Sequence, residues 1–287
     1  MNVYIIGVGL IGGSLALQIR KKQKDAVIYG IDQEEGHLKK ALEIKLIDRG
    51  ANLDDIADAD WIIIAVPVDQ SRRLMPLVLD RIAEGALVFD VGSTKAAICE
   101  SVKDHPKRKQ YLATHPIAGT EFSGPLAAKE DLFKGKVNIL CETERTDPEL
   151  LRRAKYFFEE VGMTIRYMNP VDHDKHIAYC SHLSHISSFM LGKTVIDKET
   201  NEAGILDMAG SGFASTVRLA KSSPSMWAPI FLQNKENVMQ ALEEYIANLS
   251  SFKDALEQDN YLELFEQMKN ANRIRKILDP ARHGLPQ

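Results

Sequence analysis

The feature that most constrains the fold is a glycine-rich loop close to the N-terminus. The loop, GVGLIG at positions 7–12, follows an apolar run at 3–6 and opens an amphipathic helical segment. In a strand–loop–helix unit the first glycine permits a tight turn, the second lets a pyrophosphate approach the backbone, and the third allows close helix packing. The helix N-terminus then offers free N–H groups to the anion. We therefore expect a dinucleotide to contact Gly7, Val8, Gly9, Leu10, Ile11 and Gly12.

An acidic residue stands where the ribose of such a cofactor would lie. Asp32 ends the second apolar run, 20 residues beyond Gly12, where a carboxylate accepts hydrogen bonds from a ribose 2′-hydroxyl. The three residues after it include no arginine to receive a 2′-phosphate, which favours NAD over NADP. Val66 and Pro67, at the end of another apolar run, complete the expected cofactor contacts.

Short apolar runs alternate with helical patterns through the first part of the chain. The runs are rich in Val and Ile without strict alternation, which is typical of strands covered on both faces. They predict an α/β fold with a Rossmann-like, doubly wound, mainly parallel sheet in a dinucleotide-binding domain at 1–169. The expected strands are 3–6, 27–31, 61–66, 87–91, 111–114, 137–140 and 164–167.

From about residue 170 onward the pattern becomes helical throughout. Asp172 is the expected N-cap of a long helix reaching about residue 198. Wide apolar faces on the later helices have little sheet to cover, so we predict an all-helical substrate and dimerisation domain at 170–279 and a homodimer. The polar stretch 280–287 is expected to be a disordered tail. The apolar series are Val238, Leu242, Ile246, Leu249, Phe252 and Leu256, and then Leu264, Phe265, Met268, Ala271, Ile274 and Leu278.

Composition argues against several classes of partner. With a formal net charge of −4 over 287 residues, the chain offers no electrostatic basis for binding nucleic acid or an anionic membrane. No apolar run reaches the roughly 18 residues of a membrane helix. The three cysteines are widely spaced without a CxxC pair, which favours free thiols in a reducing, cytoplasmic environment.

Four further segments carry unusual concentrations of polar residues. They are DVGSTK at 90–95, HPIAGTE at 115–121, SHLSH at 181–185, and GSGF at 210–213 followed by Arg218 and the PSMW of 224–227. With these blocks, in this order, the chain resembles the prephenate/arogenate dehydrogenase family, often called TyrA, over nearly its whole length. The resemblance implies a monofunctional enzyme of tyrosine biosynthesis that uses NAD.

The family's reaction is an oxidative decarboxylation. The resemblance implies that a base takes the proton of the hydroxyl on a cyclohexadienol ring, that hydride passes to the nicotinamide, and that the ring carboxylate leaves as CO2. Such chemistry needs a base of tunable pKa, a cation for the substrate's side-chain carboxylate and a dry pocket. The implied product from prephenate is 4-hydroxyphenylpyruvate.

The resemblance also implies roles for individual residues. His115 matches the catalytic histidine, and Ser93 matches a serine that contacts the substrate hydroxyl; without the family, Ser93 reads as the N-cap of a helix at 95–102. Arg218 matches the arginine that binds the side-chain carboxylate, which a planar guanidinium can grip bidentately. His185 matches a histidine near the ring carboxylate, and His182 lies on roughly the same helical face.

A second group of residues belongs to the implied substrate pocket and its gate. Glu121, Asp174 and Trp227 match residues that join Arg218 in a gating network, with the Trp in or near the partner subunit, and Thr120 lies beside Glu121. For Trp227, plain packing is an equal alternative. The two nearby histidines could also bind a metal, but no third ligand accompanies them, and we expect no metal site.

The chain departs from the family where many relatives carry an acid near Ser215, three residues before the arginine. Another acid must orient Arg218, or the arginine is held differently. Three alternatives stay open at this point. They are an arogenate or dual-specificity cyclohexadienyl dehydrogenase, a β-hydroxyacid or imine dehydrogenase with a helical second domain, and a non-catalytic NAD-sensing protein.

Overall fold

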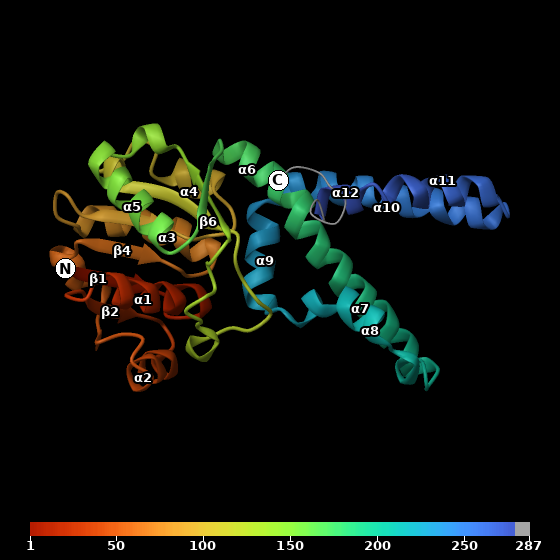
Figure 1. The fold of residues 1–287 in the computed structure, drawn as a ribbon, viewed down its shortest axis with the longest axis horizontal. Helices are drawn as coiled ribbons and strands as arrows, with labels where there is room; N and C mark the ends of the chain where they lie inside the picture. Colours follow the sequence, from red (N-terminus) through yellow and green to blue (C-terminus); the bar gives the residue numbers. More distant parts are fainter. Residues whose placement is uncertain (279–287) are drawn as a thin grey trace. The chain divides into compact units, whose positions relative to one another are not determined.

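The computed structural model describes residues 1–278 of the chain (Figure 1). Its contacts divide it into two compact units, one from Met1 to Val238 and one that begins at Met239. The first unit contains the sheet and every candidate site residue named above. The tail expected at 280–287 lies outside the described residues.

The sheet of the first unit has eight strands in the order β3-β2-β1-β4-β5-β6-β7-β8. All neighbouring pairs are parallel except β6 and β7, which run antiparallel. The mainly parallel, doubly wound sheet is therefore confirmed. The strands are β1 Asn2–Ile6, β2 Val27–Ile31, β3 Arg49–Gly50, β4 Trp61–Ile64, β5 Leu87–Asp90, β6 Tyr111–Pro116, β7 Val137–Cys141 and β8 Thr164–Tyr167.

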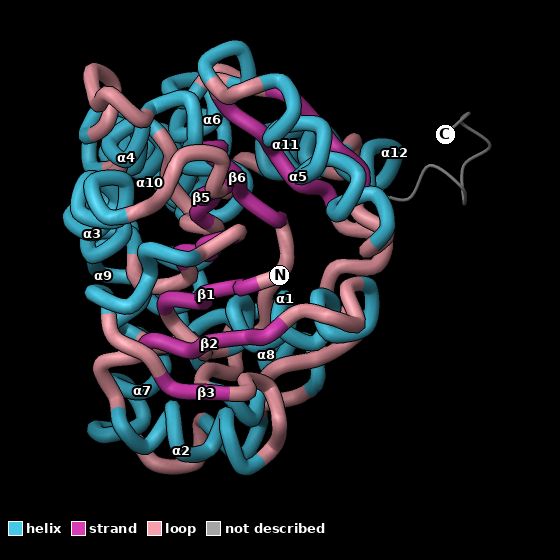
Figure 2. Tube along the Cα trace, turned by 90° about the vertical axis from the view of Figure 1, so that its left-hand side faces the viewer, coloured by secondary structure: helices cyan, strands magenta, loops and turns pink. Residues whose placement is uncertain are grey.

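Both faces of the sheet are covered by helices, which explains the continuous apolar runs (Figure 2). Alternate residues of one strand enter different clusters. Val3 and Ile5 pack with α1 (Leu10–Lys22), α2 (Glu35–Glu43) and α5 (Pro148–Glu160). Tyr4 and Ile6 pack with α3 (Val68–Arg81) and α4 (Ala96–Ser101). A strand with two buried faces needs apolar side chains at every position.

The helices are α1 Leu10–Lys22, α2 Glu35–Glu43, α3 Val68–Arg81, α4 Ala96–Ser101, α5 Pro148–Glu160, α6 Pro170–Ile177, α7 Leu183–Asn201, α8 Ser211–Thr216, α9 Pro224–Gln233, α10 Lys235–Glu257, α11 Tyr261–Ala271 and α12 Ile274–Leu278. The chain is helical after β8, as the sequence predicts. Within the described residues, no helix is long and apolar enough to cross a membrane.

The long helix expected from Asp172 to about residue 198 differs in two respects. Its N-cap is Asn169, whose side chain accepts from the Val171 N–H, with Pro170 at the first helical position. Proline fits there because its missing N–H would be unpaired anyway. The helix is also interrupted by a π-helical turn, Ala178–His182, between α6 and α7.

Candidate functional site

The candidate site lies at the carboxyl ends of the parallel strands. Strands β1, β4, β5 and β6 are parallel neighbours, so their carboxyl ends meet at the same edge. Gly7, Val66 and Ser93 follow the first three of these strands, and His115 is the penultimate residue of β6. The strand order reverses at β1, which pairs with both β2 and β4. Ligands of doubly wound sheets bind at such a switch point.

The glycine loop leaves room for a pyrophosphate. Gly7 has a φ of +95°, and a Cβ there would lie 2.4 Å from the Ala65 carbonyl oxygen. A Cβ on Gly12 would lie 2.0 Å from the Gly7 oxygen, so the helix packs directly on the turn. At Gly9 the nearest atom to such a Cβ is the Gly124 nitrogen at 4.0 Å, which leaves bare backbone. No side chain caps the first amides of α1, so these residues fit the phosphates of NAD.

Asp32 lies beside this loop. Its Oδ2 accepts from the Val8 N–H at 3.1 Å, and its Oδ1 accepts from the Glu34 N–H at 3.0 Å. The His37 Nδ1 stands 3.5 Å from Oδ1. Each carboxylate oxygen keeps a lone pair that a ribose hydroxyl can reach. His37 was not singled out from the sequence.

The segment that follows His115 is anchored on α1. The Ser14 hydroxyl accepts from the Lys129 N–H at 2.9 Å, and the Gln18 side chain donates to the Glu130 carbonyl oxygen. The loop that contains Thr120 and Glu121 thus connects β6 to α1, the helix that begins in the glycine loop. Within it, the Thr120 hydroxyl accepts from the Phe122 N–H at 3.2 Å.

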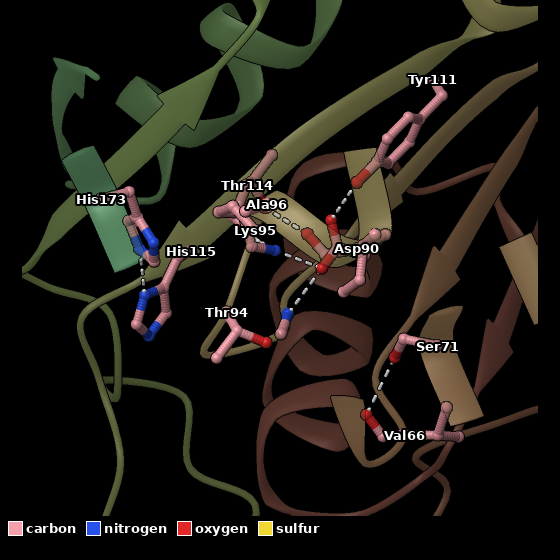
Figure 3. Close-up of polar contacts among 12 residues, drawn as sticks. Val66, Ser71, Asp90, Thr94, Lys95, Ala96, Tyr111, Thr114, His115 and His173 are labelled. Carbon is pink, nitrogen blue, oxygen red and sulfur yellow. Dashed lines mark hydrogen bonds and ion pairs between the residues drawn. The ribbon is translucent and has the colours of Figure 1, made fainter. Parts of the chain in front are cut away.

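His115 is buried at the end of β6, with 7% of its surface exposed. Its Nδ1 lies 2.8 Å from the Nε2 of His173 on α6 (Figure 3). Burial lowers the pKa of His115 well below its ordinary value, and charge on His173, Lys95 or His182 lowers it further. Among the described residues, no hydrogen bond engages the His115 Nε2. The imidazole is therefore neutral near pH 7 and has one nitrogen free to accept a proton.

A buried ion pair fixes the strand ends beside His115. The fully buried Lys95 ammonium donates to the Asp90 carboxylate and, at 2.7 Å, to the carbonyl oxygen of Thr114 (Figure 3). Asp90 also accepts from the Tyr111 hydroxyl at 2.8 Å. The pair ties β5 to β6 immediately before His115, so removing either charge would leave the other unpaired in the core.

Ser93 does not act as a helix N-cap. Helix α4 begins at Ala96 rather than Lys95, and the Asp174 carboxylate accepts from both the Lys95 and Ala96 N–H groups, at 2.7 and 2.9 Å. The Ser93 side chain is partly exposed and makes no hydrogen bond within residues 1–278. Its neighbour Thr94 is buried and accepts from the Gln233 side chain of α9 at 2.7 Å.

A second group of side chains comes from the helical segments. His185 stacks on Trp227 with ring centroids 3.5 Å apart, and its Nδ1 donates to the Ser181 carbonyl oxygen at 2.9 Å. Arg218 forms an ion pair with Glu121 at 3.3 Å, and its side chain is 52% exposed. Burial lowers the pKa of His185, and the nearby Arg218 charge contributes. Among the described residues, Glu121 is the carboxylate that forms an ion pair with Arg218.

His182 is more enclosed than its neighbour. It is fully buried, lies edge-on to Trp227, and its Nδ1 is 3.2 Å from the Asn234 amide nitrogen. Burial lowers the pKa of His182 to about 4. Trp227 itself is buried within its own chain, against Val68 and the two histidines.

Asp174 does not join Arg218 as the resemblance implied. It is buried, caps α4, and its Oδ1 lies 2.8 Å from the Nδ1 of His173. His173, like His37, was not singled out from the sequence. It lies outside the recognised motifs, and only its place beside Asp174 in a new helix sets it apart. Among the described residues, no group of three or more potential ligands is placed to hold a metal ion.

Comparisons with known proteins agree over nearly the whole chain. A family model described as the prephenate dehydrogenase nucleotide-binding domain matches residues 15–167, and one described as the dimerization domain matches 169–270. The prephenate dehydrogenase of Bacillus subtilis is 32% identical over 287 residues, which cover 99% of this chain and 77% of the relative.

Solved structures are similar as well. The prephenate dehydrogenase of Aquifex aeolicus, in complex with hydroxyphenyl propionate and NAD+, superposes with a TM-score of 0.88 at 35% identity, over 97% of this chain and 98% of that chain. Synechocystis arogenate dehydrogenase gives a TM-score of 0.75 at 27% identity, over 96% and 99%. By its sequence and its fold, this chain belongs to the prephenate dehydrogenase family.

Proposed function

We propose that the chain catalyses the NAD-dependent oxidative decarboxylation of prephenate to 4-hydroxyphenylpyruvate. The observation that carries the proposal is the buried His115, whose Nε2 has no hydrogen-bond partner within residues 1–278. His115 lies at the carboxyl ends of the parallel strands, as the glycine loop does. When bound, NAD supplies the hydride acceptor of the reaction. A non-catalytic NAD sensor would not need a desolvated base at this place.

His115 takes up the proton of the substrate's ring hydroxyl at Nε2. Because burial lowers the pKa of His115, the imidazole is already deprotonated near pH 7. The partly exposed Ser93 hydroxyl follows the neighbouring strand and is free to hydrogen-bond to the same substrate oxygen. The ring carboxylate leaves as CO2, next to His185 and Trp227.

Arg218 binds the side-chain carboxylate at the far end of the substrate. A planar guanidinium offers two parallel N–H donors to such a group. In the chain alone it contacts Glu121, so the substrate carboxylate must compete with that carboxylate or share the guanidinium with it. Thr120, on the same loop, and His182, behind Trp227, shape the pocket around these groups.

We further propose a cytosolic homodimer whose helical segments from residue 170 onward supply both the substrate pocket and the subunit contact. Large apolar side chains on α10 and α11 are half or more exposed in the single chain, among them Leu249, Leu256 and Leu262. Such surfaces are typical of obligate interfaces.

Purified protein should reduce NAD in the presence of prephenate, with one CO2 released per NADH. Changing His115 to Asn should lower kcat by about 10²- to 10⁴-fold and leave NAD binding intact. Rates with prephenate and arogenate, each with NAD and NADP, should be highest for prephenate with NAD. Faster turnover of arogenate would show that arogenate, not prephenate, is the preferred substrate. Absence of turnover with both compounds would contradict the proposed function.

A further inference from the structure

A line of hydrogen bonds runs inward from His115, and Figure 3 shows its first contact, with His173. The His115 Nδ1 lies 2.8 Å from the His173 Nε2, and the His173 Nδ1 lies 2.8 Å from the Asp174 Oδ1. His173 is 1% exposed and Asp174 is 3% exposed, so water does not compete for these contacts. The two rings lie nearly edge to face, with centroids 5.0 Å apart.

The position of each proton in this line follows from Asp174. Its two oxygens already accept the N–H groups of Lys95 and Ala96, which suits an ionised carboxylate that acts only as an acceptor. His173 must then donate from Nδ1, which leaves a lone pair on its Nε2. That lone pair accepts from the His115 Nδ1–H, and the His115 Nε2 is left as the basic nitrogen.

We propose that His173 and Asp174 are positioning residues that hold His115 in its Nδ1–H tautomer and share the positive charge when His115 gains a proton. The inference rests on the function proposed above, because it names the device that makes the outward nitrogen of His115 the base. Free imidazole has no such constraint; the hydrogen bond at one ring nitrogen decides the role of the other.

The other charged and titratable groups around His115 and His173 are neutralised or neutral, so Asp174 is the group that stabilises a positive charge on the pair. Lys95, from the segment before α4, is neutralised by the Asp90 carboxylate. His182, from the π-helical turn, is neutral because burial lowers its pKa to about 4. Asp174 is the carboxylate in contact with the pair.

The proton balance is simple. The substrate hydroxyl gives its proton to the His115 Nε2, and the Nδ1 proton of His115 moves toward the His173 Nε2 as the hydride leaves the substrate. Asp174 stays ionised throughout, and the pair later returns one proton to solvent. A carboxylate two hydrogen bonds away therefore stabilises the imidazolium without being protonated, as in hydrolase triads.

The test separates this role from helix capping. Asp147 offers a matched control, because its carboxylate caps α5 by accepting from two backbone N–H groups and lies outside the site. Nitrogen-15 NMR of histidine-labelled protein should show His115 and His173 as Nδ1–H tautomers. Asp174→Asn should shift His115 toward the Nε2–H form and lower kcat by about 10²- to 10⁴-fold with little change in KM. Asp147→Asn should change neither.

His173→Phe keeps a buried ring but removes the acceptor, and should also lower kcat at least tenfold and release the His115 tautomer. An Nε2–H form of His115 in the wild-type protein would overturn the inference without any variant. So would wild-type kcat in both His173→Phe and Asp174→Asn. If the wild-type protein shows the expected tautomers but no turnover of prephenate, the proposed function fails and the tautomer assignment stands.

Discussion

At the scale of single residues, Arg218 connects the loop after β6 to the helical segment. It pairs with Glu121 at 3.3 Å and is half exposed, so it can turn to a ligand without leaving a buried charge behind. Arg218→Ala should raise KM for prephenate by about 10- to 100-fold, because a hydrogen-bonded charge pair contributes about 1.5–3 kcal/mol. The effect on kcat should be smaller, since the lost contact is far from the reacting hydroxyl.

Steady-state kinetics with Lys221→Ala as the control would check this prediction. Lys221 is an exposed cation at the end of the same short turn, Arg218–Lys221, and its removal should leave KM unchanged. Equal KM values for the wild-type and Arg218→Ala proteins would exclude the arginine from carboxylate binding.

Some site residues were predictable from the sequence and others were not. His115, Ser93 and Arg218 stand in motifs, so their places could be expected, and the ends of parallel strands brought the first two to one edge. Asp174 was expected beside Arg218, but its carboxylate instead accepts from the Lys95 and Ala96 N–H groups at the start of α4. The contact of His173 with His115 spans 58 residues and depends on how α6 packs, which no local pattern reveals.

At the scale of elements, the π-helical turn Ala178–His182 decides how two histidines are used. His182 is fully buried on the turn, whereas His185, in the first turn of α7, is partly exposed beside Trp227. π-helical turns inside α-helices are frequent at functional sites.

Because His182 is buried in this turn, we expect the stability of the fold to decrease in acid. Burial lowers the pKa of His182 to about 4, whereas in the unfolded chain it keeps the ordinary value of 6.5. Between these two pH values the unfolded chain takes up a proton and the folded chain does not. Because a pKa difference of one corresponds to about 1.4 kcal/mol, the free energy of unfolding should fall by roughly 3 kcal/mol over this range. Stability is full above the unfolded pKa and falls as the pH falls. His182→Gln keeps an acceptor for Asn234 and should remove most of that loss.

Urea unfolding at pH 7 and pH 4.5 measures the effect. The difference between the two pH values should be smaller in His182→Gln than in the wild-type protein. His105→Gln is the control, because His105 lies on the surface loop after α4 and pairs with Asp80. An equal pH dependence in the wild-type and His182→Gln proteins would contradict the assignment.

Elements were predictable where burial imposed a pattern. Strands with both faces buried left unbroken apolar runs, and their ends differ from the predicted ones by at most two residues. Strand β3 was missed because its two residues are exposed and carry no apolar signal. The cap of α6 was placed at Asp172 instead of Asn169, although proline at the next position favours Asn169.

At the scale of the whole molecule, the apolar faces of the second unit predict association. Phe265 on α11 is 45% exposed and Leu262 is 73% exposed in the single chain. Phe265→Asp should shift sedimentation from twice 32.1 kDa toward 32.1 kDa, because a carboxylate would be buried without a partner in the interface. Asn270→Asp, an exposed polar position on the same helix, should leave the dimer intact. A monomeric wild-type protein would contradict the proposed assembly.

His115 and Arg218 are expected to contact opposite ends of one small substrate. A crystal structure of the protein with NAD and 4-hydroxyphenylpyruvate tests this directly. We predict the phenol oxygen about 3 Å from the His115 Nε2, and the side-chain carboxylate on the Arg218 guanidinium. A product molecule whose hydroxyl lies away from His115, or whose carboxylate contacts a different cation, would contradict these roles of His115 and Arg218.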